Sequence, residues 1–368
     1  MQIIDREKYD YTLPEALIRK EGVEPRDSAR LFVYDTTTDT VTFDIFKNLT
    51  RYLPAQSLMV LNNTVVLPAR LWLRKETGGK IEVFVLANER EDPQRIPALV
   101  DRKIAIGQKL FFSDGSFFEV IGQNEKIFFL RLESVFSLET LLEQYGKTPL
   151  PHYLLGASME EEKLRKRYQT IFAEKGASVA APTASLHFTD RVFSSLKKKN
   201  IVTKNITLDV GLGTFAPLQD EHFLTGKLHT EFVNIPKETI QALCHAKKTK
   251  QPIIAVGTTV TRTLESFVSK SYYFRDRENS KTKKWRDEMC GNSVTYSGKT
   301  DIFIYPPYQF QMVDHLLTNF HLPKTSLMLL VDAFLQNKNA KRGIVELYAL
   351  AIKNNFSFYS FGDSMLIV

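Results

Sequence analysis

Six short segments of this 368-residue sequence place histidine, threonine, arginine or carboxylate side chains inside apolar or glycine-rich stretches. Because burying a polar group costs free energy unless it is hydrogen-bonded, such residues are candidates for a functional site. The first segment, VAAPTASLHFTDR, holds His187 between Leu186 and Phe188. A histidine in this setting is either a satisfied core residue or a proton-transfer group.

Two further segments contain paired glycines or a histidine beside a carboxylate. In DVGLGTFAPL, Gly211 and Gly213 follow a strand-like run, where they either turn the backbone sharply or let a ligand approach it closely. In KLHTEF, His229 and Glu231 alternate along the chain, so an extended backbone would place both on one face. These two residues form either an acid/base pair or part of a surface strand.

The segment AVGTTVTRTLES predicts a strand, a turn at Gly257 and a helix that begins near Thr258 and Thr259. The first N–H groups of a helix have no partners within the helix, and its N-terminus carries a partial positive charge. A ligand carboxylate or hydroxyl can therefore bind there, with Arg262 one turn further as an additional donor. Helix capping alone also explains the threonines.

The last two segments lie near the C-terminal end. LLTNFHLPKTS places Asn319 and His321 just before a long apolar helix, and FGDSML places Asp363 in a turn. The sequence has no GxGxxG after its first strand and no GxxxxGK[ST], HExxH or GxSxG, so dinucleotide, P-loop, zincin and hydrolase signatures are absent. Cys244 and Cys290 form no metal-ligand spacing, and we predict no metal site.

The elements that must position these residues fall into two classes. Residues 57–133 consist mainly of short β-like runs, which predict a small barrel or sandwich. Amphipathic helices alternate with buried strands after residue 155, and residues 30–45 predict a β-hairpin that belongs with them. We therefore predict an α/β main domain, residues 1–66 plus 152–368, with a small all-β, barrel-like domain inserted at 67–151.

Predictions can also be made for two further segments of the sequence. EEEKLRKRYQTIFAE predicts one amphipathic helix, with Leu164, Tyr168, Ile171 and Phe172 on the same face. Residues 272–292 are charged and have no clear period, so they form either a solvated loop or an arm that contacts phosphates.

The composition favours a soluble protein with a polyanionic partner. The chain has 49 basic and 42 acidic residues and a formal net charge of +7 at pH 7, which makes RNA a candidate partner. The N-terminus has no apolar signal core, and the longest apolar run, LMLLVDAFL, is far too short to span a bilayer. We expect a cytoplasmic protein that does not enter a membrane.

Taken in order, these segments resemble the S-adenosylmethionine:tRNA ribosyltransferase-isomerase family of queuosine biosynthesis. The resemblance extends over nearly the whole chain. It includes YDYTLPEALI, LPARL, RKETGGKIEV, PLPHY, VAAPTASLHFT, VGLGTF, LHTE, VGTTVTRTLES, TDIFIYPPY, LLTNFHLPKTSLMLLV and FGDSMLI. So many long matches in one order make a chance likeness implausible. The resemblance implies an α/β domain with an inserted β-barrel domain, as predicted above.

The resemblance also implies a reaction. S-adenosylmethionine serves as co-substrate and ribosyl donor, with no permanently bound cofactor, and adenine and methionine are released. The acceptor is 7-aminomethyl-7-deazaguanine at the wobble position of a tRNA with a GUN anticodon, and the product is epoxyqueuosine. We expect the protein to act as a monomer.

Such a reaction needs a base for the carbon next to the sulfonium, a proton donor for adenine and a pocket that tolerates a cation. For proton transfer we predict His187, His229 and Glu231. For binding S-adenosylmethionine or the acceptor we predict Gly211, Gly213, Thr258, Thr259, Arg262, Asp301, Asn319, His321 and Asp363.

The sequence departs from the usual family pattern at several positions. Asn63 and Val65 stand where Asp and Arg are usual, and Ser185 and Pro307 each stand where Gly is usual. Residues 272–292 look inserted. The joint loss of an acid and a base at 63 and 65 either removes one ion pair or alters substrate binding.

Two other functional classes remain as alternatives. An S-adenosylmethionine-dependent RNA methyltransferase would share the co-substrate, but such enzymes usually have a Gly-rich turn after the first strand, which this sequence lacks. A non-enzymatic RNA-binding protein would explain the charge but not the polar segments in apolar surroundings. Release of adenine, release of S-adenosylhomocysteine, or neither distinguishes the three classes.

Overall fold

The computed structural model describes residues 5–150, 159–211, 218–273 and 295–368. Their larger part is built on a nine-stranded sheet in the order β15-β13-β12-β3-β14-β16-β17-β1-β2. Its members are β1 (Arg30–Asp35), β2 (Thr40–Ile45), β3 (Leu58–Asn62), β12 (Val202–Leu208), β13 (Lys227–Ile235), β14 (Ile253–Val256), β15 (Tyr296–Ile302), β16 (His315–Asn319) and β17 (Ser364–Ile367).

The centre of this sheet is parallel. Strand β3 pairs in parallel with both β12 and β14, and β14 pairs in parallel with β16. Antiparallel pairings connect β12 to β13, β13 to β15, β16 to β17, and β1 to β2. β3 and β14 are buried along their whole length, as expected for parallel strands covered on both faces.

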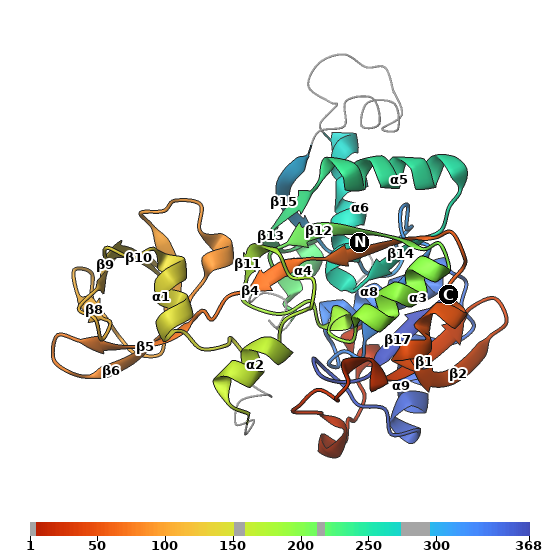
Figure 1. The fold of residues 1–368 in the computed structure, drawn as a ribbon, viewed down its shortest axis with the longest axis horizontal. Coiled ribbons are helices and arrows are strands. Elements are labelled where there is room, and N and C mark those ends of the chain that lie inside the picture. Colours follow the sequence, from red (N-terminus) through yellow and green to blue (C-terminus); the bar gives the residue numbers. More distant parts are fainter. Residues whose placement is uncertain (1–4, 151–158, 212–217, 274–294) are drawn as a thin grey trace, which may run out of the picture.

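Helices cover both faces of the sheet (Figure 1). Alternate residues of β3 point to opposite faces, so Val60 joins the core under α5, α6, α8 and α9, whereas Met59 joins the core under α3. The α-helices are α1 (Leu138–Tyr145), α2 (Glu161–Arg167), α3 (Asp190–Lys198), α4 (Asp220–Thr225), α5 (Lys237–Thr249), α6 (Thr258–Tyr273), α8 (Ser326–Asn337) and α9 (Ile344–Lys353). Short 3-10 helices are η1 (Arg6–Tyr9), η2 (Glu15–Leu17), η3 (Arg26–Ser28), η4 (Phe46–Tyr52), η5 (Ala87–Glu89) and η7 (Thr183–Ser185).

A second, all-β part follows the first strands of the main sheet. Six antiparallel strands pair in the order β10-β7-β6-β5-β8-β9, and β9 pairs back to β10, so the ring of pairings closes. Inward residues such as Leu71, Val83 and Phe118 form one core, which Leu141 of α1 also enters. The strands are β5 (Arg70–Lys75), β6 (Lys80–Val85), β7 (Ile96–Val100), β8 (Lys109–Phe111), β9 (Phe117–Asn124) and β10 (Ile127–Glu133).

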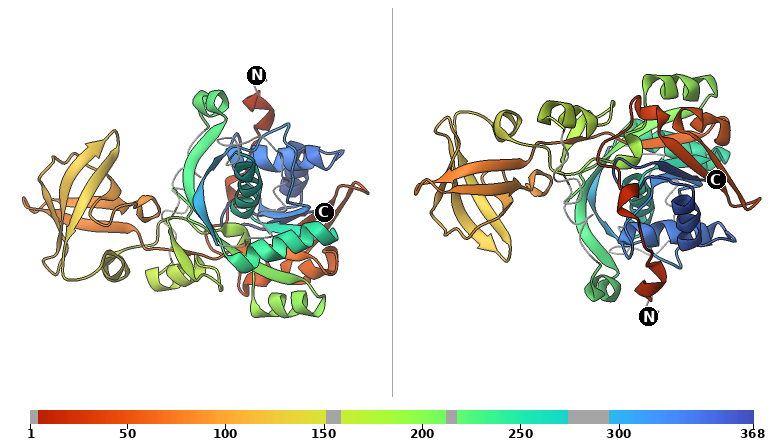
Figure 2. Two further views of the ribbon diagram at one scale, coloured as in Figure 1. Left: turned by 90° about the horizontal axis from the view of Figure 1, so that it is seen from above. Right: turned by 90° about the horizontal axis from the view of Figure 1, so that it is seen from below.

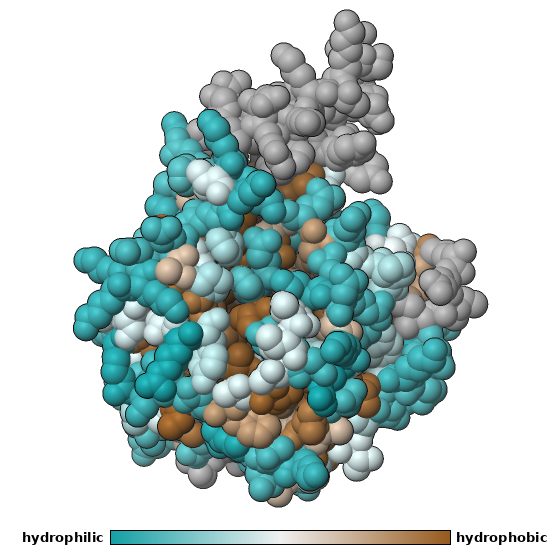
Figure 3. Space-filling view, turned by 90° about the vertical axis from the view of Figure 1, so that its right-hand side faces the viewer, coloured by the Kyte–Doolittle hydropathy of each residue, from teal (hydrophilic) through white to brown (hydrophobic). Residues whose placement is uncertain are grey.

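The barrel stands apart from the main sheet in all the ribbon views (Figures 1 and 2). The chain enters it just after β4 (Thr64–Val66), which pairs in parallel with β11 (Lys175–Ser178) to form a separate two-stranded sheet. The face of the main part away from the barrel is mostly hydrophilic, with hydrophobic atoms gathered toward its middle (Figure 3). Among the described residues, none of the helices combines the length and apolar character that a bilayer span requires.

Most of the predicted elements are present. The hairpin at 30–45 is confirmed as β1 and β2, and the expected division into an α/β part and an all-β part is confirmed in outline. The single helix predicted for EEEKLRKRYQTIFAE is wrong, because α2 ends at Arg167. Beyond it, the Gln169 side chain accepts a hydrogen bond from the backbone N–H of Val66 and the Gln169 carbonyl accepts one from Arg26. These tertiary contacts outweigh helix propensity there.

Glu265 fixes helix α6 to the loop before β16. Its side chain is 1% exposed and accepts hydrogen bonds from the backbone N–H groups of Gln311 (3.0 Å), Met312 (2.9 Å) and Val313 (3.2 Å). Burial raises the pKa of Glu265, whereas the three donors oppose that shift. The carboxyl group therefore accepts hydrogen bonds from three backbone N–H groups of the loop, two of which belong to buried residues.

We predict that Glu265→Ala lowers the free energy of unfolding by about 3 kcal/mol or more, because each buried donor left without a partner costs about 1–3 kcal/mol. Urea denaturation followed by circular dichroism measures the change. Glu346→Ala, which removes an exposed carboxylate from α9, serves as the control and should cost at most about 1 kcal/mol. Equal losses in the two variants would contradict this account of Glu265.

Candidate active site

The candidate site lies where parallel strands of the main sheet end. β14 leads through Gly257 into α6, and β16 ends at Asn319. Because parallel strands place their carboxyl ends at one edge of a sheet, the segments that follow them meet there, and ligands of open α/β sheets bind at such an edge. The sequence segments that carry threonines, an amide and a histidine are thereby brought together.

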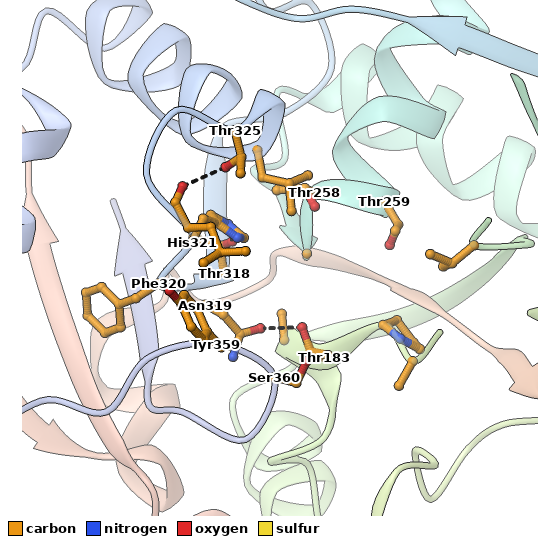
Figure 4. A pocket seen from close by; sticks show the side chains of 17 residues that line it. Thr183, Thr258, Thr259, Thr318, Asn319, Phe320, His321, Thr325, Tyr359 and Ser360 are labelled. Carbon is orange, nitrogen blue, oxygen red and sulfur yellow. Dashed lines mark hydrogen bonds between the residues drawn. The ribbon is translucent and has the colours of Figure 1, made fainter. Parts of the chain in front are cut away.

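A cavity of about 80 Å³ occupies this edge. Roughly 10–15 Å³ of such space holds one water molecule, so the cavity has room for a group of several heavy atoms. Among the residues that the structure describes, no Lys, Arg, Asp or Glu lines it. The lining residues are Ala181, Pro182, Thr183, Ala184, Val210, Gly257, Thr258, Thr259, Thr318, Asn319, Phe320, His321, Leu322, Thr325, Leu327, Tyr359 and Ser360 (Figure 4).

Asn319 presents an unused donor to this cavity. Its side chain is 2% exposed, and its amide oxygen accepts a hydrogen bond from the Thr183 hydroxyl at 2.9 Å, so the two side chains point toward each other (Figure 4). The Nδ2 atom is buried and has no hydrogen-bond partner within the part of the chain that the structure describes. Leaving a buried donor unpaired costs free energy, which a ligand oxygen would recover.

His321 contributes a neutral ring. Its Nε2 lies 2.9 Å from the hydroxyl of Thr318, and its backbone N–H donates to the hydroxyl of Tyr348 at 3.0 Å. The hydroxyl of Tyr11 donates to the backbone carbonyl of His321. Burial lowers the pKa of His321 to about 3, so the imidazole carries no charge at neutral pH.

The N-terminus of α6 closes another side of the cavity. Gly257 adopts a φ of 90°, which favours glycine, and its N–H donates to the carbonyl of Leu317 on the neighbouring strand at 2.7 Å. Thr258 and Thr259 follow as the first residues of the helix, and both are buried. The turn therefore aims the free N–H groups of a 16-residue helix at the cavity.

A buried ion pair supports this helix from behind. Arg262 of α6 pairs with Glu231 of β13, and the two residues are 5% and 3% exposed. Glu231 also accepts a hydrogen bond from the N–H of Gly211 at 3.2 Å, and Arg262 Nε donates to the carbonyl of Ile302 at 3.3 Å. The pair thus connects α6, β13, β15 and the end of β12. Arg262 Nη2 is buried without a hydrogen-bond partner in the described residues.

Other predicted site residues lie outside the cavity. His187 is 4% exposed, its ring packs 5.2 Å from that of Phe46, and its Nδ1 lies 3.4 Å from the carbonyl of Arg26. Burial lowers the pKa of His187 to about 4. Asp363 accepts from the backbone N–H groups of Arg30 and Ser357, so it holds the chain near the C-terminal strand.

The two residues predicted to share a face of β13 differ in burial. The pairing of β13 with β15 shifts register between Lys227 and Glu231, which leaves His229 exposed beside the ring of His222 while Glu231 is buried. Asp301 on β15 forms an ion pair with Lys227 at 3.0 Å. Gly213 falls outside the described residues.

Sequence reasoning missed several residues that line the cavity, among them Thr318, Tyr359 and Ser360. Thr318 directly precedes Asn319 in the buried strand β16 and belongs to the same sequence segment. That segment could therefore have indicated Thr318 as a site residue as well. Tyr359 has a φ of 72°, which is uncommon for a residue other than glycine and is seen at functional sites. That conformation had no signal in the sequence.

Comparison with known proteins decides the family. A family model described as "Queuosine biosynthesis protein" matches residues 6–367. The chain belongs to this queuosine biosynthesis family. It is 39% identical to the S-adenosylmethionine:tRNA ribosyltransferase-isomerase of Sulfurihydrogenibium sp. over 98% of both chains, and 38% identical to that of Carboxydothermus hydrogenoformans over the same shares. The solved structure of S-adenosylmethionine tRNA ribosyltransferase from Thermotoga maritima is 31% identical, has a TM-score of 0.52, and is matched over 98% of this chain and 100% of that chain.

In this member of the queuosine biosynthesis family, Asn63 is satisfied without an ion pair. Its amide nitrogen donates to Glu174 at 3.3 Å, and its amide oxygen accepts from the hydroxyl of Thr207 at 2.7 Å. The hydrogen bonds of Asn63 are therefore made without a basic side chain at position 65. Ser185 is buried, with no hydroxyl partner among the described residues.

We predict that His187 makes this family member less stable in acid. Because its pKa is lowered from 6.5 to about 4, the folded chain binds fewer protons than the unfolded chain between these values. Unfolding free energy therefore falls as pH drops from 6.5 toward 4, by up to about 3 kcal/mol from this group. His187→Asn should flatten that pH dependence in urea titrations at pH 7 and pH 4.5. The exposed His229→Asn is the control, and parallel curves for wild type and His187→Asn would refute the prediction.

Proposed function

We propose that this chain is an S-adenosylmethionine:tRNA ribosyltransferase-isomerase. It transfers and isomerises the ribosyl group of S-adenosylmethionine onto 7-aminomethyl-7-deazaguanine at the tRNA wobble position, giving epoxyqueuosine and releasing adenine and methionine. The observation that carries the proposal is the family match over residues 6–367, together with relatives of that name aligned over 98% of their length. The polar cavity at the carboxyl ends of β14 and β16 supports the same conclusion.

The cavity suits one end of S-adenosylmethionine. Asn319 Nδ2 and the N-terminus of α6 offer N–H donors, which match the carboxylate of the methionine moiety. The cavity is too small for the whole donor, so we infer that it takes this end and that the sulfonium lies near its mouth. No cationic side chain among the described residues lines the cavity and His321 is neutral, so no side chain there places a full positive charge against the sulfonium.

Glu231 is the proton-transfer candidate that the geometry favours among the three predicted residues. Its carboxylate accepts a hydrogen bond from the N–H of Gly211, which follows the cavity-lining Val210. In contrast, His187 is enclosed beside Phe46, and His229 is exposed. The carboxyl group of Glu231 forms an ion pair with Arg262, and a carboxylate is one of the groups that serve as general bases. The roles of Gly213, Asp301 and Asp363 in binding stay predictions.

We further propose that residues 67–151 form an inserted domain and that 1–66 plus 152–368 form the catalytic domain. The closed ring of six strands and its separate core support this division. The enzyme would act as a cytoplasmic monomer on tRNAs with a GUN anticodon, use S-adenosylmethionine as co-substrate and hold no permanent cofactor. A net charge of +7 favours a tRNA partner.

The decisive assay incubates the purified protein with S-adenosylmethionine and tRNA that carries the aminomethyl-deazaguanine. Release of adenine together with the mass of epoxyqueuosine in the digested tRNA supports the proposal. Release of S-adenosylhomocysteine would instead identify an RNA methyltransferase, and tRNA binding without either product would identify an RNA-binding protein. Both results would overturn the proposed function.

We predict that Asn319→Asp raises the KM for S-adenosylmethionine at least tenfold. The substitution replaces the free donor by an acceptor of the same shape and adds a negative charge that repels the donor carboxylate. Steady-state adenine release measures KM and kcat, and circular dichroism checks that the variant is folded. Asn124→Asp, at the exposed end of β9, is the control, and an unchanged KM in Asn319→Asp would remove the cavity from donor binding.

We predict that Glu231→Gln lowers kcat about 100-fold or more, since general-base catalysis contributes roughly 10²–10⁴-fold. It also weakens the affinity for S-adenosylmethionine, because it breaks the ion pair with Arg262 that holds α6 in place. The neutral amide keeps the shape of the side chain but loses its basicity. Isothermal titration measures binding, and quenched-flow adenine release measures the rate. A variant that binds and turns over like the wild type would exclude Glu231 as the base.

A further inference from the structure

The outer face of the barrel carries a row of basic and aromatic residues. Lys80 lies directly opposite Arg74, Arg74 opposite Phe111, and Phe111 opposite Phe117. The row therefore crosses strands β6, β5, β8 and β9 in succession. All four side chains alternate with the inward residues Ile81, Leu73, Leu110 and Phe118 of the barrel core, so they point outward.

Trp72 extends this row along β5. It lies two residues before Arg74 and hence on the same face, and it is 52% exposed. On β8 and β9, the rings of Phe111 and Phe117 are 5.4 Å apart, and the Lys109 ammonium lies 4.7 Å from the centre of the Phe117 ring. We call Trp72, Arg74, Lys80, Phe111 and Phe117 the Trp72 face.

The cations of this face are uncompensated. Arg74 and Lys80 are directly opposite each other, a like-charge arrangement that destabilises a sheet. Neither forms an ion pair with any described residue, and the only hydrogen bond of the Arg74 guanidinium is to the carbonyl of Gly78 at 3.4 Å. Two other arginines of the barrel are paired: Arg70 with Glu82, and Arg131 with Glu119.

We propose that the Trp72 face binds the RNA substrate, with Arg74 and Lys80 on phosphates and the aromatic rings stacked on an unpaired base. Basic residues interleaved with exposed aromatics are the combination that binds single-stranded or looped RNA, because every base has a face to stack and every nucleotide has a phosphate. An anionic backbone also relieves the repulsion between Arg74 and Lys80. The inference rests on the proposed function, which supplies an RNA substrate.

The position of the face suits a long substrate. β5 runs from the junction with the main sheet to the outer tip of the barrel, where Arg74 and Lys80 flank the β5–β6 turn (Figures 1 and 2). A tRNA whose wobble nucleotide lies near the mouth of the main-sheet cavity can contact this tip with another part of the same molecule. The second contact raises the affinity for tRNA without changing the rate of the chemical step.

The test compares Arg74→Gln/Lys80→Gln and Trp72→Ala with the wild type. Fluorescence anisotropy with labelled substrate tRNA at several KCl concentrations measures Kd and its salt dependence, and adenine release at saturating tRNA measures kcat. We expect the double variant to weaken tRNA binding at least fivefold and to lower the slope of log Kd against log[KCl] by about 1–2. Trp72→Ala should weaken binding about tenfold through lost stacking. In both variants kcat stays within twofold of the wild type.

Lys126→Gln is the matched control, because it removes an exposed cation from the turn at the other end of β9 and should leave Kd and the salt slope unchanged. Wild-type values of Kd and salt slope in both test variants would overturn the proposed RNA surface while leaving the enzymatic function intact. Weakened binding in the variants, in a protein that releases no adenine, would support the surface and overturn the function. A wild type that binds no tRNA would overturn both.

Discussion

The buried ion pair between Glu231 and Arg262 is the interaction on which the site depends. Two opposite charges, 3% and 5% exposed, join the antiparallel edge of the main sheet to the helix that forms one wall of the cavity. Removing one partner of such a pair leaves a buried charge without compensation, which costs about 3–5 kcal/mol. Helix α6 can therefore not shift away from β13 without a large penalty, and its N-terminus stays aimed at the cavity.

The contacts of α6 extend this constraint in both directions. At its start, the N–H of Gly257 donates a hydrogen bond to the carbonyl of Leu317 in β16. Because Asn319 ends the same strand, the helix and Asn319 keep a fixed separation. Further along, Glu265 fixes the loop that leads into β16. One helix thus sets the geometry of both segments that line the cavity, and a site this small tolerates little displacement before hydrogen bonds are lost.

The cavity is neutral, although the substrates are charged. Its polar groups are threonine hydroxyls, an amide, an unprotonated histidine and helix N–H groups. Such groups can orient a carboxylate without presenting a cation that would repel a sulfonium. The uncompensated cations lie instead on the barrel, away from the cavity, where the polyanionic partner would be held. Donor and RNA are thereby assigned to surfaces of different chemistry.

Part of this site could be predicted from the sequence, because local rules determine it. A strand followed by glycine and a threonine-rich helix start predicted the turn at which Thr258 and Thr259 line the cavity, and Asn319 and His321 likewise lie at the end of a strand. The separation of His229 from Glu231 depends on a register shift against β15, some 70 residues away, which no local pattern encodes. The enclosure of His187 likewise depends on Phe46 and Arg26, which come from distant parts of the chain.

The family resemblance added what local rules could not give, namely the chemistry. It did not identify which residues perform each step. The same sequence motif can serve the fold or the reaction, and the burial of its side chains in the folded chain decides between the two. Asn63 shows the difference: the resemblance marked it as a departure, whereas its contacts with Glu174 and Thr207 show how the chain accommodates it.

The most direct test of the central claim is a crystal structure of the protein with S-adenosylmethionine bound. The account predicts that the methionine carboxylate lies in the cavity within hydrogen-bond distance of Asn319 Nδ2 and of the first N–H groups of α6, with the Glu231–Arg262 pair intact behind it. A donor molecule bound elsewhere, with only water in this cavity, would contradict the account.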